Sequence, residues 1–127
     1  MKMVIRLSIL FLLNLLNSVS LQAQQAEFSF DKKIIKLAPA QEGEELTISF
    51  PFENKGSAPL IITKADVECS CTGVNFKQEP ILPGEQSVIE VKFDSNGKSG
   101  WQYRKIQLFA NTKKGKTTIE FRVKIIN

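Results

Sequence analysis

Strict alternation of apolar and polar residues is the feature that most limits what this chain can fold into. Near the C-terminus, Ile119, Phe121, Val123 and Ile125 are each separated by a single polar residue. Successive side chains of a β-strand point to opposite faces, so this spacing puts the four apolar side chains on one face of a strand. Further segments with the same apolar spacing are Phe28–Phe30, Ile35–Leu37, Leu46–Phe52, Ile89–Phe93 and Ile106–Ala110.

Turn-forming residues separate these segments at regular spacing. Asn54-Lys55-Gly56-Ser57 and Pro83-Gly84 have the composition of tight turns, and Asn111 to Gly115 fits a hairpin loop. Pro51 cannot donate a hydrogen bond to a neighbouring strand, so we expect an edge strand or a bulge at that point. Together these signals predict an all-β fold, an immunoglobulin-like antiparallel β-sandwich of about seven strands.

The N-terminal segment has the three parts of a secretory signal peptide. Lys2 and Arg6 supply positive charge, Leu7 to Leu16 form a short apolar core, and Leu21-Gln22-Ala23 offers a small residue for cleavage. We expect a signal peptide at residues 1–23, cleaved after Ala23, and an immunoglobulin-like domain at residues 24–127. The alternative is a retained anchor, although the apolar core is shorter than the roughly 20 residues of a spanning helix.

Cleavage of this signal peptide leaves a domain that is nearly neutral. The whole chain has a net charge of +4, and loss of Lys2 and Arg6 reduces it to +2. The basic run Lys113-Lys114-Gly115-Lys116 falls in the expected hairpin loop, where lysines are usually solvated. We therefore expect no nucleic-acid partner and, after cleavage, no membrane span.

Residue types argue against an enzyme. The chain has no histidine, which is the commonest general base and a frequent metal ligand. A Ser-His-Asp or Cys-His arrangement is therefore impossible within this chain. Gly97-Lys98-Ser99 resembles the end of a phosphate-binding loop, but Lys92 stands where the first glycine is required and no helix follows. We expect no enzymatic activity and no cofactor.

Cys69 and Cys71, the only two cysteines, are the chemically distinctive residues. On a regular strand their Cα atoms would lie about 6.6 Å apart, near the upper limit for a disulfide, so a bond would require puckering or a bulge. A ring that encloses Ser70 alone would contribute only about 1.6 kcal/mol to stability before strain is subtracted.

The cysteine pair has three interpretations. We favour a local disulfide at a strand end that shapes a loop. The second is a pair of reduced thiols packed as small apolar groups. The third is a functional site at Cys69 and Cys71, either a redox-active pair or a two-thiolate site for a soft metal such as Cu(I). A zinc site would need two more ligands from another chain.

Trp101 is the remaining residue with two interpretations. It follows Gly100 at the start of a strand, close to Tyr103. We expect it to cover the open end of the sandwich with its indole N–H turned outward. The alternative is an exposed aromatic contact residue for a partner.

Several motifs occur in an order that resembles known domains. Asn54 to Ile62 resembles the N-x-G-x-x-P-L-x-I stretch of Hydin-type immunoglobulin-like domains. The motifs that follow are Glu68-Cys69-Ser70-Cys71-Thr72, Ile81-Leu82-Pro83-Gly84-Glu85, Val91-Lys92-Phe93-Asp94 and Gly97-Lys98-Ser99-Gly100. This succession is similar to a large family of secreted bacterial domains of unknown function, numbered fifteen seventy-three, whose signature is Cys-Gly-Cys-Thr followed by Pro-Gly-Glu.

The resemblance covers Glu44 to Ile125 and implies a fold and an exported location, without an activity. Ser70 stands where the family usually has glycine, so a turn that required positive φ there would be strained.

These observations lead to one functional hypothesis and one rival. The hypothesis is an exported, non-enzymatic binding or structural module of the cell envelope, in the periplasm, on the outer surface or outside the cell. Its partner would be a protein or another envelope component. The rival is a thiol-based redox or soft-metal function at Cys69 and Cys71.

Overall fold

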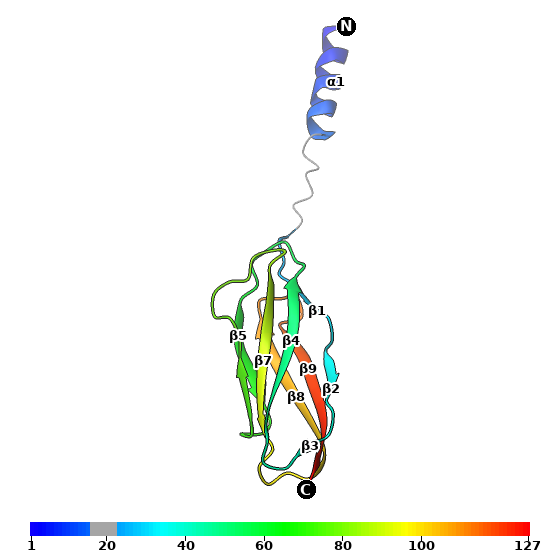
Figure 1. Ribbon diagram of the computed structural model, residues 1–127. Coiled ribbons are helices and arrows are strands. Elements are labelled where there is room, and N and C mark those ends of the chain that lie inside the picture. The colour runs from blue at the N-terminus through cyan, green and yellow to red at the C-terminus, as the bar shows by residue number, and fades with distance from the viewer. Residues whose placement is uncertain (16–22) are drawn as a thin grey trace.

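The computed structural model describes residues 1–15 and 23–127, in which one helix is followed by nine strands (Figure 1). The helix is α1 (Lys2–Leu15). The strands are β1 (Phe28–Phe30), β2 (Ile34–Lys36), β3 (Ala40–Gln41), β4 (Glu45–Asn54), β5 (Ile62–Val67), β6 (Thr72–Asn75), β7 (Gln86–Asp94), β8 (Gly100–Ala110) and β9 (Lys116–Ile126).

The helix α1 falls within the predicted signal peptide. Its large apolar side chains are exposed where they are described, as at Met3 and Phe11. None of the helices described is long and apolar enough to cross a membrane. Leu16 and two residues of the expected cleavage site, Leu21 and Gln22, lie outside the described residues, so the signal peptide stays a prediction.

The strands form two sheets that pack face to face as a β-sandwich, which confirms the predicted fold class (Figure 1). The four-stranded sheet has the order β1-β4-β7-β6, and the five-stranded sheet has the path β2-β9-β8-β5 with β3 also paired to β9. Pairing is antiparallel except that β2 and β3 run parallel to β9. The sandwich is thus antiparallel apart from the edge formed by β2 and β3.

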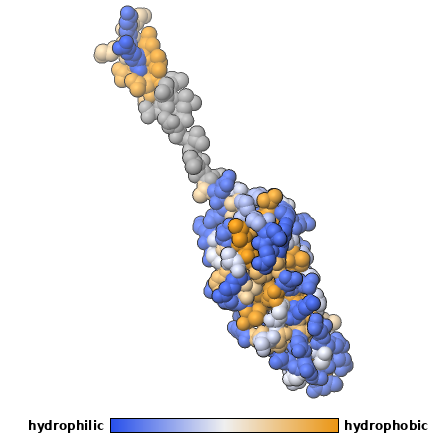
Figure 2. Space-filling model, turned by 90° about the vertical axis from the view of Figure 1, so that its left-hand side faces the viewer, coloured by the Kyte–Doolittle hydropathy of each residue, from blue (hydrophilic) through white to orange (hydrophobic). Residues whose placement is uncertain are grey.

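The core confirms the period-two pattern. In β4, Ile48, Phe50 and Phe52 are buried while the residues between them are exposed. Phe93 from one sheet and Phe121 from the other meet edge to face, with ring centroids 5.2 Å apart. Hydrophilic side chains cover much of the side on which β5 lies, with smaller hydrophobic areas among them (Figure 2).

Pro51 does not mark an edge strand or a bulge, contrary to expectation. It lies in β4, which has β1 on one side and β7 on the other, in continuous register with Val88. The carbonyl of Pro51 accepts a hydrogen bond from the Asp31 N–H, just beyond the end of β1. N and C=O of one strand residue point to the same side, so the missing N–H faces the place where β1 has already ended.

The buried side chain of Asn54 joins separate segments at one end of the sandwich. Its Nδ2 donates to the carbonyls of Ala58 at 2.8 Å and Ile81 at 2.9 Å. Its Oδ1 accepts from the N–H groups of Gly56 at 2.9 Å and Glu27 at 3.2 Å. All four hydrogen bonds that an asparagine amide can readily make are thus formed, and we call this set the Asn54 network.

Gly56 lets the N-terminal end of the domain pass close to this network. A Cβ atom added at Gly56 would lie 2.7 Å from Ala26 Cα and 2.6 Å from the Glu27 nitrogen, and closer still to the Gln25 carbonyl. These are backbone atoms, so they cannot yield as the tip of a side chain can. This close approach of the backbone explains why residue 56, two positions after Asn54, is a glycine.

The Pro83-Gly84-Glu85 turn closes over the same end. Gly84 has a φ of 81°, and its N–H donates to the Asn54 carbonyl at 2.7 Å. The Glu85 carboxylate accepts from the Leu82 N–H at 2.9 Å and also pairs with Lys77. The hydrogen bond from Lys77 is the main cause of a lowered pKa of Glu85, followed by the one from Leu82.

Replacing Asn54 with alanine should strongly destabilise the domain. Asn54→Ala leaves two N–H groups and two carbonyls without their partner, and each buried polar group left unsatisfied is costly. We expect a loss of about 3 kcal/mol or more in the free energy of unfolding, measured by chemical denaturation. Asn75→Ala, at an exposed position of β6, should stay within about 0.5 kcal/mol of wild type.

Gly56→Ala tests the close backbone approach. The added methyl must displace residues 25–27, so we expect a loss of about 2 kcal/mol and faster hydrogen exchange in that segment. Gly73→Ala is the matched control, because its Cβ would meet nothing within 4 Å and no positive φ is required. Equal stability of the two variants would contradict this account.

Candidate functional site

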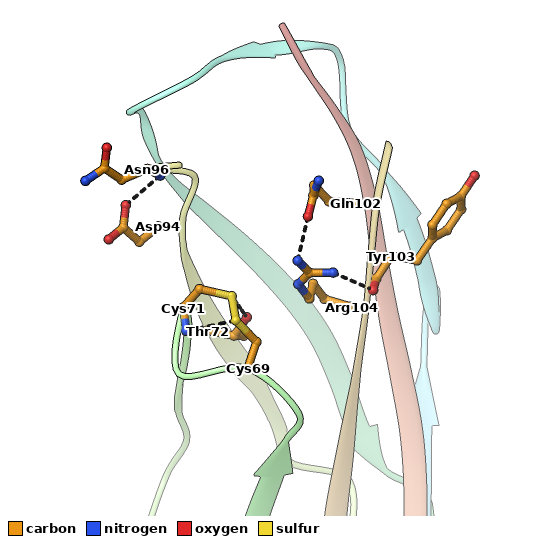
Figure 3. Close-up of a disulfide and its surroundings, with 8 residues drawn as sticks. All are labelled: Cys69, Cys71, Thr72, Asp94, Asn96, Gln102, Tyr103 and Arg104. Carbon is orange, nitrogen blue, oxygen red and sulfur yellow. Dashed lines mark hydrogen bonds between the residues drawn. A yellow bond between two sulfur atoms is a disulfide. The ribbon is translucent and has the colours of Figure 1, made fainter. Parts of the chain in front are cut away.

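The Cys-x-Cys segment lies in the turn that carries the chain from one sheet to the other. It connects β5, the last strand of the five-stranded sheet, with β6, the last strand of the four-stranded sheet. Cys69 and Cys71 are half-buried, and Ser70 between them is exposed. Figure 3 shows the two sulfur atoms joined at this turn.

The turn brings the two cysteines closer than a strand would. Their Cα atoms are 5.1 Å apart and their sulfur atoms form a disulfide. Ser70 and Cys71 belong to a turn instead of a strand, and the Thr72 N–H donates to the Cys69 carbonyl at 3.1 Å. Among the described residues, positive φ occurs at glycines alone, so serine fits between the cysteines without that strain.

The disulfide is anchored on its Cys71 side. The Cys71 carbonyl accepts from the Asp94 N–H at 2.8 Å, and Cys71 packs against the core. The Cys71 N–H donates to Cys69 Sγ at 3.2 Å, and Cys71 Sγ lies 3.6 Å from the hydroxyl of Thr72. Sulfurs bonded to one another are not thiolate ligands, so a metal site at this pair would first require reduction.

No cluster of three or more potential metal ligands of the His, Cys, Asp or Glu type occurs in the part of the chain that the structure describes. The predicted soft-metal site at Cys69 and Cys71 would therefore have two protein ligands from these types at most. Two thiolates suit Cu(I) better than Zn²⁺, because structural zinc sites have four protein ligands.

Arg104 and Gln102 form a polar pair inside the sandwich that we did not predict. Arg104 donates to Gln102 Oε1, and Gln102 Nε2 donates to the Ser99 carbonyl at 2.9 Å. The Arg104 guanidinium lies over the Phe93 ring at 5.5 Å, and its buried Nε has no hydrogen-bond partner among the described residues. Extending the apolar spacing of Ile106–Ala110 backwards would have put both residues on the inward face.

Trp101 does not cover the open end of the sandwich. It is 46% exposed on the outer face of the five-stranded sheet, since the next residue, Gln102, points inward. Tyr103 is 55% exposed on the same face, and the two rings stack with centroids 6.2 Å apart. Figure 3 shows the Tyr103 ring directed away from the side on which Arg104 lies. The role of Trp101 as a partner contact stays a prediction.

Cations from neighbouring strands hold these two rings. Lys36 Nζ lies 5.2 Å from the centroid of the Trp101 ring, and the Arg122 guanidinium lies 5.7 Å from that of Tyr103. Lys124 is directly opposite Trp101 in the β8–β9 register. We call Trp101, Tyr103, Lys36, Arg122 and Lys124 the aromatic–basic face.

A carboxylate on the same side of the sheet orients Arg122. Glu120 is 9% exposed and accepts from Arg122 Nε at 2.6 Å. This hydrogen bond, together with the attraction between the two charges, raises the pKa of Arg122. The guanidinium is therefore held in place next to Tyr103 while its side chain stays 40% exposed.

Solved structures with the same fold come from several kinds of protein. A protein of unknown function from Porphyromonas gingivalis W83 matches with a TM-score of 0.70 at 16% identity, over 85% of this chain and 51% of that one. The ASH/PapD-like domain of human CEP192 matches with a TM-score of 0.62 at 10% identity, over 81% and 87%. The YadV chaperone matches with a TM-score of 0.59 at 12% identity, over 79% and 52%.

The chain thus spans about half the length of two of these structures. Proteases and glycoside hydrolases also match this fold at 16% identity or less, and the chain covers at most 32% of them. At such identities the likeness establishes the fold alone. No curated protein matches the sequence.

The family described as "Protein of unknown function (DUF1573)" matches residues 28–125, from the start of β1 almost to the end of β9. This range includes the cysteine turn, the aromatic–basic face and, apart from Glu27, the Asn54 network. Together with the PapD-like neighbours, it identifies a β-sandwich domain. The chain belongs to the DUF1573 family.

Proposed function

We propose that the protein is exported and acts in the cell envelope as a binding module that contacts a protein partner through the aromatic–basic face. The observation that carries the proposal is the pair of exposed rings, Trp101 and Tyr103, each held by a cation. The N-terminal segment, with its basic residues and apolar core, supports export. The chaperone among the structural neighbours is a protein that acts on other proteins, which fits a role of this kind.

The physical properties of this face suit binding. Trp, Tyr and Arg dominate the energetic centres of protein interfaces, because they bury a large area and retain polar groups for specific contacts. Side chains that are already ordered lose less conformational entropy when a partner binds. Stacking of the rings and the hydrogen bond between Arg122 and Glu120 supply such order before binding.

The double variant Trp101→Ser/Tyr103→Ser tests this role. We expect it to fold normally, because both side chains are largely outside the core, and to lose its partner. The partner is detected by crosslinking in the producing cell, followed by recovery of the crosslinked protein. Intact-mass analysis checks that the mature chain begins at Gln24, as cleavage after Ala23 predicts. Leu82→Ser/Val88→Ser is the control, since these exposed apolar residues lie elsewhere.

Two outcomes would count against the proposal. One is a wild-type protein that stays free and monomeric in its own compartment. The other is a partner that the Trp101→Ser/Tyr103→Ser variant still binds as wild type does.

A thiol-based function at Cys69 and Cys71 is the second candidate. The observation in its favour is the backbone N–H of Cys71, which donates to Cys69 Sγ and would stabilise a thiolate there after reduction. Reduction would add two electrons and two protons to give two thiols, with an external dithiol as the reductant.

Replacing both cysteines separates the two candidates. The free energy of unfolding of Cys69→Ser/Cys71→Ser should lie within about 2 kcal/mol of the wild-type value, because the disulfide closes a very short ring. The binding proposal expects the partner to be retained in this variant. Loss of all biological activity in a folded Cys69→Ser/Cys71→Ser protein, with the aromatic–basic face intact, would favour the thiol function instead.

A further inference from the structure

We infer that the partner of the aromatic–basic face is an acidic protein surface. The inference rests on the proposed function and adds the chemical class of the partner. It comes from the distribution of charge between the two outer faces of the sandwich, which net charge conceals.

The outer face of the five-stranded sheet is basic. Its outward positions, identified by alternation with the buried residues, include six cations and two carboxylates. The cations are Lys36, Lys64, Lys105, Lys116, Arg122 and Lys124, and the carboxylates are Asp66 and Glu120. The net charge of this face is therefore +4.

The outer face of the four-stranded sheet is acidic. Its outward positions include four carboxylates and one cation. The carboxylates are Glu45, Glu53, Glu90 and Asp94, and the cation is Lys92. The net charge of this face is −3, so an acidic partner would be repelled from one side of the molecule and attracted to the other.

The cations of the basic face are mostly uncompensated. Among the described residues, Arg122 pairs with Glu120 and Lys64 pairs with Asp66. Lys36, Lys105 and Lys124 form no ion pair within the described part of the chain. These ammonium groups and the guanidinium of Arg122 are donors that carboxylates satisfy well.

The aromatic residues of this face favour a polypeptide over a polysaccharide. Sugar rings bind aromatic side chains by lying on an open ring face. Trp101 and Tyr103 stack against one another, and each has a cation over its ring. Phe109, further along β8, has Lys64 at 5.0 Å in the same arrangement. Their faces are thus largely occupied, whereas their edges and the cations remain available to carboxylate and apolar side chains.

The experiment measures binding of three labelled probes to the domain at physiological salt concentration. The probes are poly-L-glutamate for an acidic polypeptide, alginate for an acidic polysaccharide, and vesicles with one-third anionic lipid. The variants are Trp101→Ser/Tyr103→Ser and Lys36→Glu/Lys124→Glu. The control is Lys113→Glu/Lys114→Glu, which makes the same change of net charge in the exposed hairpin loop.

We expect poly-L-glutamate to bind more tightly than the other two probes. Each face variant should weaken this binding by about tenfold or more, and the loop control should change it by less than about threefold. Raising the salt concentration should also weaken it. Circular dichroism and thermal unfolding establish that the variants are folded.

Other results would overturn the inference. Tighter binding of alginate or of vesicles, lost in the same variants, would assign a different class of ligand. Equal loss in the loop control would indicate attraction to net charge alone. Absence of binding to all three probes would exclude recognition by acidity. A partner captured in cells through Trp101 and Tyr103, yet insensitive to Lys36→Glu/Lys124→Glu, would leave the proposed function standing and remove the acidic partner.

Discussion

The hydrogen bonds of the Asn54 amide are the constraint on which one end of the sandwich depends. Asn54 ends β4, yet its side chain bonds to the N-terminal segment at Glu27, to the following turn and to Ile81. Its backbone N–H and carbonyl bond to Glu85 and Gly84. One residue thereby determines how the chain enters the domain and how the long connection before β7 closes. A buried amide satisfied in this way specifies a single arrangement, because any displacement leaves several polar groups unpaired.

The aromatic–basic face depends on the register of β8 and β9. Trp101 pairs with Lys124 and Tyr103 with Arg122, so the rings and the cations from the two strands share one face. Slippage by one residue would turn Trp101 inward and expose Gln102. That register is secured by the opposite face, where Ile106 and Leu108 of β8 and Phe121 and Val123 of β9 are buried. The core therefore fixes the composition of the surface, and the parallel pairing of β2 with β9 adds Lys36 to it.

The parts of the fold that depend on local periodicity were predictable, and those that depend on distant contacts were not. Alternation was enough for β4, β7 and β9, because each strand buries one face. Pro51 misled because its missing N–H is tolerated at the place where β1 ends, and the residues of β4 do not reveal where β1 ends. Trp101 misled because a position at the start of a strand was taken to lie over the end of the sandwich, whereas pairing with β9 places it on the outer face of β8. The turn at the cysteines likewise follows from a change of sheet between β5 and β6, which residue types do not encode.

The sites of the two candidate functions, the aromatic–basic face and the cysteine turn, lie on opposite sides of β8 and are therefore physically separate. Tyr103 points outward to the aromatic–basic face, while Arg104 points inward and lies over Phe93. Phe93 precedes Asp94, and the Asp94 N–H donates to the Cys71 carbonyl. The cysteine turn is therefore connected to the inward side of β8 through Phe93 and Arg104. The disulfide constrains a ring too short to stabilise the sheets much, and the buried side chains of both sheets remain when it is absent. The register that presents Trp101 and Tyr103 therefore does not depend on the disulfide.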